Sequence, residues 1–261
     1  MKISNQTVSI ITGGSKGIGK GISKALASKG SQIHMVSRSQ PEGIEEEMLK
    51  SGAESATFWP VDLSSFDDAK RFYEEFEAKY GTPDILINNA GQLTGGLLEE
   101  QSAEAIHRML QVNLVTLVTL TRWFLPGMLK RKSGKIVNNA SVSGKMFFPC
   151  ASTYAASKAG VVGFTESLKQ ELRDTGVSTL LLITAGVKTE MYDEIHDLYG
   201  GHLELDFLSS IPVADWANKV VSAIEKDQDT LWPPGSSKIG VNIGHHFPNL
   251  FESLISSKFK R

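Results

Sequence analysis

The sequence is poor in cysteine and in net charge. Its 261 residues include one cysteine, Cys150, and the formal net charge is −2. One thiol cannot form an internal disulfide and gives no metal-site spacing, which favours a reducing compartment, and we expect the cytoplasm. Nucleic-acid-binding surfaces are usually strongly basic, so we expect a small-molecule partner and no nucleic acid.

Long uninterrupted apolar runs are also lacking. Before the first glycines the apolar run is residues 8–11, too short for the hydrophobic segment of a secretory signal. Residues 112–129 are mostly apolar but are interrupted by Asn113, Arg122, Pro126 and Gly127. We therefore expect a buried helix there rather than a membrane span.

Short β-branched runs alternate with longer amphipathic stretches, with no linker, low-complexity tract or repeat between them. This alternation is typical of a parallel sheet covered by helices on both faces, and predicts one doubly wound α/β domain over residues 1–261. Its ligand should lie at the carboxyl ends of the strands. The expected strands are residues 7–12, 32–37, 55–61, 85–88, 135–140, 177–184 and, as a seventh, 238–243. The expected helices are residues 17–29, 43–51, 66–80, 103–130, 154–174 and 212–226.

A glycine-rich segment joins the first expected strand to the first expected helix. It reads Thr12-Gly13-Gly14-Ser15-Lys16-Gly17-Ile18-Gly19. Glycines let the backbone turn sharply and approach a pyrophosphate, and the following helix N-terminus presents unpaired N–H groups. A turn without a ligand is the alternative, but a strand before and a helix after favour a nucleotide site.

Further motifs occur in a fixed order along the chain. Asn88-Asn89-Ala90-Gly91 ends the fourth expected strand, Asn113 lies in the long helix beyond it, and Ser141 precedes Tyr154-Ala155-Ala156-Ser157-Lys158. With the T-G-x-x-x-G-x-G spacing of the glycine segment, they resemble the short-chain dehydrogenase/reductase family over roughly residues 7–190. Each motif alone occurs by chance on many chains, whereas the ordered set favours the family and its Rossmann-like fold of six or seven strands.

The Tyr154 and Lys158 pair predicts proton chemistry. Hydride transfer to a ketone leaves an alkoxide that needs an acid. Free tyrosine has a pKa of about 10, and a lysine one helical turn away stabilises the phenolate and lowers that pKa. Ser141 would hydrogen-bond the substrate oxygen. The resemblance implies that Lys158 also holds the nicotinamide ribose and that Asn113 positions a water joining Lys158 to solvent.

Basic residues favour NADP(H) over NAD(H). The second expected strand ends at Arg38 without a carboxylate, and Lys16 adds a second cation that could bind a 2′-phosphate. Two solvated surface cations are the alternative. Asp62, followed by Leu63, matches the family position that contacts adenine, although a helix cap would explain the same residue.

The resemblance implies one continuous set of cofactor contacts. Ala185 stands where the family usually has proline, which leaves the turn before the last two contacts less rigid. The implied contacts are Gly13, Ser15, Lys16, Gly17, Ile18, Gly19, Arg38, Asp62, Leu63, Asn89, Ala90, Gly91, Tyr154, Lys158, Val187 and Thr189.

Residues 190–210 are expected to cover the substrate. Their apolar side chains indicate an apolar pocket, unless they only pack the segment itself; they are Met191, Tyr192, Leu198, Leu203, Leu205 and Phe207. In the extension, residues 245–261, one helical face could bring together Phe247, Leu250, Phe251, Leu254 and Ile255. We expect this face to pack on the protein or a second subunit rather than on a membrane. The His245-His246 pair lacks companion ligands, so we expect no metal.

The leading interpretation is an NADP(H)-dependent oxidoreductase that interconverts a carbonyl and a secondary alcohol, with Tyr154 as general acid and base. A 3-oxoacyl-thioester reductase of lipid synthesis is an alternative, although the Val-Asp-Gly-Gly ending familiar from those enzymes is absent. A non-catalytic NADP(H)-sensing protein is another, which the intact set of Asn113, Ser141, Tyr154 and Lys158 disfavours. The resemblance implies a homodimer or homotetramer.

Overall fold

The computed structural model describes residues 1–205 and 208–261. Seven parallel strands form one sheet in the order β3-β2-β1-β4-β5-β6-β9. They are β1 (Val8–Thr12), β2 (Gln32–Ser37), β3 (Ser55–Pro60), β4 (Ile85–Asn88), β5 (Gly134–Asn139), β6 (Val177–Leu182) and β9 (Thr230–Leu231). This is the predicted Rossmann-like, doubly wound architecture. The strand order reverses between β1 and β4, where such sheets leave a crevice for a ligand.

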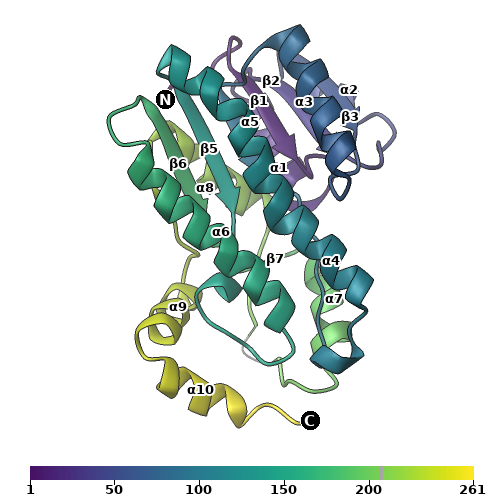
Figure 1. The fold of residues 1–261 in the computed structure, drawn as a ribbon, viewed down its shortest axis with the longest axis vertical. Helices are drawn as coiled ribbons and strands as arrows, with labels where there is room; N and C mark the ends of the chain where they lie inside the picture. The colour runs from purple at the N-terminus through teal and green to yellow at the C-terminus, as the bar shows by residue number, and fades with distance from the viewer. Residues whose placement is uncertain (206–207) are drawn as a thin grey trace.

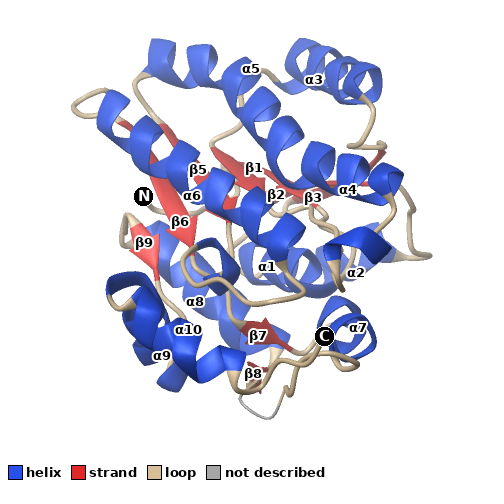
Figure 2. Cartoon of the chain, turned by 60° about the horizontal axis from the view of Figure 1, so that its bottom comes forward, coloured by secondary structure: helices blue, strands red, loops and turns tan. Residues whose placement is uncertain are grey.

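Helices cover both faces of the sheet (Figure 2). On one face lie α3 (Phe66–Tyr80), α4 (Ala103–Leu110), α5 (Thr116–Arg131) and α6 (Ser152–Glu171). The opposite face carries α1 (Gly17–Ala27) and α8 (Val213–Glu225), while α2 (Ile44–Lys50) lies near β3.

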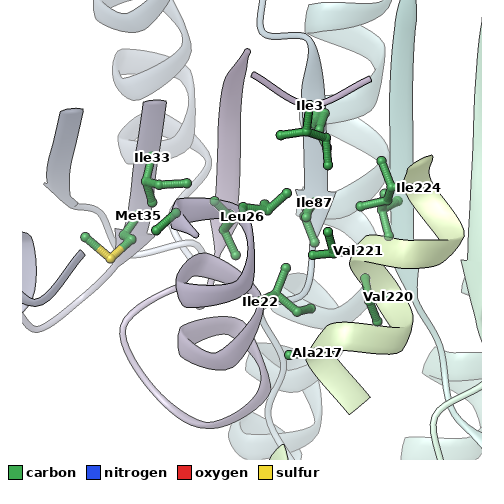
Figure 3. Close-up of a cluster of buried hydrophobic side chains, with 14 of the residues drawn as sticks. Ile3, Ile22, Leu26, Ile33, Met35, Ile87, Ala217, Val220, Val221 and Ile224 are labelled. Carbon is green, nitrogen blue, oxygen red and sulfur yellow. The ribbon is translucent and has the colours of Figure 1, made fainter. Parts of the chain in front are cut away.

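The two faces of the sheet are both apolar because parallel strands are covered on both sides. Figure 3 shows one half of the core, where Ile22 and Leu26 of α1 meet Val220 and Ile224 of α8 over Ile87 of β4. The other half is richer in aromatic rings. Its fully buried members include Phe72 and Phe76 of α3 and Phe124 and Met128 of α5.

The long apolar helix is interrupted where the sequence predicts a single element. Between α4 and α5 lies a π-helical turn, η2 (Gln111–Val115). By length and composition Ala103–Arg131 could cross a membrane, with a mean hydropathy of 1.3 in its most apolar window. In the fold, α5 buries Leu117, Leu120 and Phe124 against the sheet, as expected for a core helix.

The prediction of a strand at residues 238–243 is wrong. These residues lie inside α9 (Ser236–His246), and the seventh strand is β9, which pairs with β6. A strand would turn Ile239 and Val241 to the same side, but Val241 is fully buried and Ile239 is 63% exposed. Pro233 and Pro234 follow β9 and cannot donate to a ladder, which accounts for the short strand.

Several small elements lie beyond the carboxyl edge of the sheet, at the bottom of Figure 1. Helix α7 (Glu190–Tyr199) falls within the expected covering segment, and α10 (Pro248–Ser256) falls within the C-terminal extension. A second sheet pairs β7 (Gly186–Val187) with β8 (Ser210–Ile211) and was not predicted. Two 3-10 turns, η1 (Leu98–Glu100) and η3 (Val142–Gly144), complete this region.

Candidate active site

A cavity of about 1310 Å³ opens at the carboxyl ends of the strands and continues to α10. Of the residues that the sequence predicts for the site, Gly19 and Asn113 are not part of its lining. The predicted residues that line the cavity are Gly13, Ser15, Lys16, Gly17, Ile18, Arg38, Asp62, Leu63, Asn89, Ala90, Gly91, Ser141, Tyr154, Lys158, Val187 and Thr189. One space therefore joins the glycine segment to the tyrosine and lysine of α6.

The glycine segment is shaped by close backbone packing. Gly13 has a φ of +65°, and a Cβ added there would lie 3.0 Å from the Ala90 Cα. At Gly19 a Cβ would lie 2.1 Å from the Gly13 carbonyl oxygen, so the first turn of α1 folds directly onto the loop. Helix α1 has no acidic residue in its first turn and no side-chain cap. Its positive end is therefore left to an anion.

A network of short polar side chains joins β1, β4, β5 and the end of β6. The Thr12 hydroxyl oxygen accepts from the backbone N–H groups of Asn89 and Ala90, at 2.9 and 3.0 Å. Asn139 Nδ2 donates to Asn89 Oδ1 at 2.9 Å, and Thr184 Oγ1 donates to Asn139 Oδ1 at 2.6 Å. Asn139 and Thr184 are not among the site residues that the sequence predicts. The signal that could have identified them is a polar residue at the end of a buried apolar strand.

Asp62 is not the cap of the helix that follows. The N-cap of α3 is Ser65, whose side chain accepts from the Asp68 backbone. Asp62 Oδ1 instead accepts from the backbone N–H and the hydroxyl of Ser64, at 2.9 and 2.7 Å. Burial acts to raise the pKa of Asp62, but these bonds and the Arg38 charge lower it below its ordinary value. Asp62 and Arg38 line the same end of the cavity.

The other basic residue, Lys16, lies on the surface beside the loop. Its Nζ is 3.6 Å from Glu190 Oε2, and both side chains are largely exposed. Such exposed pairs contribute little to stability. Thr189 begins α7 by accepting from the Tyr192 backbone at 3.3 Å, and its methyl group faces Gly17, while Val187 is buried in β7. Both follow Ala185 and still reach the cavity.

Helix α6 carries Tyr154 and Lys158 one turn apart. The ammonium of Lys158 donates to the Asn139 carbonyl oxygen at 2.9 Å and lies 5.7 Å from the centre of the Tyr154 ring. Ser141 ends the segment after β5 and begins η3, where its hydroxyl oxygen accepts from the Ser143 backbone at 3.1 Å. All three predicted groups therefore face one part of the cavity.

Burial shifts the pKa values of Tyr154 and Lys158. It raises the pKa of Tyr154 to about 12, and the hydrogen bond with the Ser141 side chain only partly opposes this. It lowers the pKa of Lys158 to about 8. The sequence predicts a lowered tyrosine pKa. Desolvation of the phenolate is the larger cause of the Tyr154 shift, and the Lys158 ammonium is turned to the Asn139 carbonyl.

Asn113 lies in the π-helical turn and is fully buried. Its Nδ2 donates to the Gln92 carbonyl at 2.9 Å and to the Ser157 hydroxyl at 3.2 Å, and its Oδ1 accepts from the Gln92 backbone at 2.7 Å. The side chain therefore ties the loop after β4 to α6. Turns of this kind are frequent at functional sites.

The far end of the cavity is apolar and comes from late segments of the chain. Met146, Phe148, Tyr199, Phe251 and Ile255 line it. The expected face of α10 is divided. Phe251, Leu254 and Ile255 line the cavity, although Leu254 is also partly open to solvent, whereas Leu250 and Phe247, which precedes the helix, are exposed and are not part of the lining. Phe207, also expected here, lies outside the described residues.

The last residues of the chain pair with the segment after α7. The Glu204 N–H donates to the Lys258 carbonyl at 3.0 Å, and the Lys260 N–H donates to the His202 carbonyl at 2.8 Å. Leu203 and Phe259 form an antiparallel bridge between these bonds. Arg261 also pairs with Glu99. The tail thus holds one wall of the cavity in place.

Comparison with known proteins identifies the family. The sequence model described as short chain dehydrogenase matches residues 7–199. The protein belongs to the short-chain dehydrogenase family. The chain is 32% identical over 212 residues to a 3-oxoacyl-[acyl-carrier-protein] reductase of Chlamydia muridarum, covering 78% of this chain and 82% of that protein.

A second relative is matched over less of its own length, and two solved structures are matched over nearly all of theirs. The chain is 36% identical over 186 residues to a short chain dehydrogenase of Pseudocercospora fijiensis, covering 70% of this chain and 60% of the relative. Among solved structures, a metagenomic short-chain oxidoreductase in complex with NADP has a TM-score of 0.73 and 28% identity, covering 90% of this chain and 100% of that one. A short-chain dehydrogenase from Streptomyces avermitilis shares the fold, with a TM-score of 0.80 at 23% identity and 96% coverage of each chain.

Proposed function

We propose that this oxidoreductase interconverts a carbonyl compound and a secondary alcohol with NADP(H), and that Tyr154 gives and takes the proton. The observation that carries the proposal is the single cavity that holds Ser141, Tyr154 and Lys158 together with the glycine segment. The bound nicotinamide would supply or accept the hydride. We also propose that residues 190–210 cover the substrate and that the protein works as a homo-oligomer in the cytoplasm.

The residues of the cavity fit such a cofactor. The close approach of backbones at Gly13 and the unneutralised start of α1 suit a pyrophosphate. Arg38 and Lys16 lie at the end where a 2′-phosphate would extend the adenosine, and Asp62 is available beside them for the adenine. The metagenomic relative, solved in complex with NADP, supports the choice of NADP(H).

The proton steps follow from the side chains themselves. Ser141 and Tyr154 would hold the carbonyl oxygen by hydrogen bonds, and the Tyr154 hydroxyl would pass its proton to that oxygen as it gains negative charge. Lys158 has a pKa of about 8, near neutral pH, so it can return a proton to the phenolate. The Asn139 carbonyl keeps the lysine beside the tyrosine.

A second candidate is the reduction of 3-oxoacyl thioesters. It is favoured by the 32% identity with a protein named 3-oxoacyl-[acyl-carrier-protein] reductase. Both candidates use the same proton chemistry and differ in what the far end of the cavity binds. Rates on carrier-linked or coenzyme A-linked 3-oxoacyl substrates, beside rates on simple ketones, separate the two.

The test is a panel of carbonyls and alcohols followed by NADPH or NADP+ absorbance. We expect turnover with NADPH, and we expect Arg38→Ala to raise the KM for NADPH far more than the KM for NADH. Arg71→Ala is the matched control, because Arg71 lies on the exposed face of α3 beside Asp68. Equal effects of Arg38→Ala on both cofactors contradict the 2′-phosphate role. Tight NADPH binding without turnover of any carbonyl favours a sensing protein.

A further inference from the structure

Tyr199, the last residue of α7, has an unusual environment for a buried tyrosine. It is 6% exposed and lines the cavity. Its ring packs in an apolar cluster with Cys150, Ala151, Leu203 and Ile255. In the part of the chain that the structure describes, its hydroxyl has no hydrogen-bond partner. Buried tyrosine hydroxyls usually have one, so this group is left for a ligand.

The hydroxyl faces the open space rather than the packed interior. Among the described residues, the Tyr199 hydroxyl is not one of the polar atoms that are fully enclosed by protein and lack a hydrogen-bond partner. The same space is shared with Tyr154. Burial first, and then the charge of an ionised Tyr154, raise the pKa of Tyr199 above its ordinary value.

The ring of Tyr199 packs against a loop, and the backbone of the residue is anchored by hydrogen bonds. A Cβ added to Gly95 would lie 1.9 Å from Tyr199 Cε1, so the ring lies directly on the backbone of that loop. The Tyr199 carbonyl accepts from the N–H groups of His202 and Leu203, at 2.9 and 2.8 Å. The side chain is thus a fixed polar point in an apolar wall.

We propose that the Tyr199 hydroxyl binds a second oxygen of the substrate, away from the reacting carbonyl. The substrates that fit are carbonyl compounds with a further keto, hydroxyl or ester oxygen on an otherwise apolar body. A hydroxyl can donate to or accept from any of these groups. The neighbouring wall, with Met146, Phe148 and Phe251, accepts the apolar remainder. This inference rests on the proposed carbonyl reduction at Tyr154.

The test compares two substrates of the same shape. Ethyl 3-oxohexanoate and 4-nonanone have equal chain lengths and differ in the ester oxygens. We expect Tyr199→Phe to lower kcat/KM for the keto ester about 3- to 10-fold, as expected for one lost neutral hydrogen bond, and to leave the value for the ketone within about 2-fold. The dissociation constant of Tyr199→Phe for NADPH should equal that of the wild type.

Two further variants make the test specific. Gly95→Ala pushes the ring from its place without altering the tyrosine, and should reduce the preference for the keto ester in the same way. Tyr80→Phe is the matched control, because Tyr80 packs with His34 and Phe76 in the aromatic cluster on the α3 side. It should change neither rate.

Failure of this inference is distinguishable from failure of the proposed reaction. An equal loss on both substrates in Tyr199→Phe assigns the residue to positioning Tyr154 and overturns the substrate contact, and so does no loss on either. If the wild type reduces neither these two compounds nor any other carbonyl of the panel, the proposed reaction fails. Calorimetric titration of both compounds into the protein with NADP+ then decides the contact. Equal affinity of the wild type and Tyr199→Phe for the keto ester overturns it.

Discussion

The two ends of the cavity are held together by different forces. The cofactor end is built from a chain of hydrogen bonds through Thr12, Asn89, Asn139 and Thr184, and from backbones in close contact at the glycines. The substrate end is built from apolar side chains of α7 and α10, closed by the tail of the chain. Changes at the first end should act on cofactor affinity and stability, and changes at the second on the choice of substrate.

The largest effect on stability should come from the pH dependence of Lys158 at the boundary between the two ends. Burial lowers its pKa from 10.5 to about 8, so the unfolded chain binds more protons between these values and stability rises with pH in that window. The full contribution is about 3 kcal/mol, since each pKa unit corresponds to roughly 1.4 kcal/mol. Urea unfolding at pH 7.5 and 9.5 measures it.

Lys158→Met isolates this contribution. The wild type should gain about 2 kcal/mol relative to Lys158→Met between the two pH values. The comparison cancels the Cys150 thiol, whose raised pKa acts in the opposite direction above its ordinary value. The pKa of Tyr154 is raised to about 12, so this residue reduces the stability of the fold only above pH 10 and does not affect the comparison between pH 7.5 and 9.5. Equal pH profiles of the two proteins contradict the burial of a charged lysine here.

Gly19→Ala tests the close packing of the cofactor end. The added Cβ would lie 2.1 Å from the Gly13 carbonyl oxygen, so the loop must move. Overpacking costs about 1–3 kcal/mol, and the affinity for NADPH should fall roughly 5- to 150-fold, as measured by fluorescence titration. Gly163→Ala is the control. It meets nothing within 4 Å in α6 and should raise stability by about 0.5–1 kcal/mol. Unchanged NADPH affinity in Gly19→Ala contradicts the packed loop.

Removal of residues 258–261 tests the substrate end and should have the smallest effect. It deletes the pairing with His202 and Glu204 that holds Leu203 in the wall. We expect the KM for the carbonyl substrate to rise about 3- to 10-fold, since hydrogen bonds of this kind each contribute about 1 kcal/mol. The NADPH dissociation constant should not change. Arg261→Ala removes only the exposed pair with Glu99 and is the control. A loss of NADPH affinity on truncation contradicts the separation of the two ends.

The same division explains what the sequence could predict. The glycine segment and the Tyr154–Lys158 pair are local motifs whose spacing alone fixes their geometry, and both line the cavity. The pairing of Phe259 in the tail with Leu203 joins residues far apart in the chain, so no local sequence pattern predicts it. Strands of two residues, such as β7 and β9, are too short to show a period.

Two site features needed the structure for a further reason. Asn139 is the last residue of β5, and nothing in the sequence distinguishes it from an ordinary strand end. Its hydrogen bonds to Asn89 and Thr184 depend on the order of the strands in the sheet. Tyr199 lies among apolar residues of the expected covering segment. That its hydroxyl has no hydrogen-bond partner among the described residues becomes visible only in the structure.

The most direct test of the central claim is the rate of carbonyl reduction by Tyr154→Phe at saturating NADPH. The variant keeps the ring that lines the cavity and loses the hydroxyl. We predict a fall in kcat of about 10²- to 10⁴-fold, the range of general acid catalysis, with an unchanged dissociation constant for NADPH. A kcat equal to that of the wild type would show that Tyr154 is not the acid.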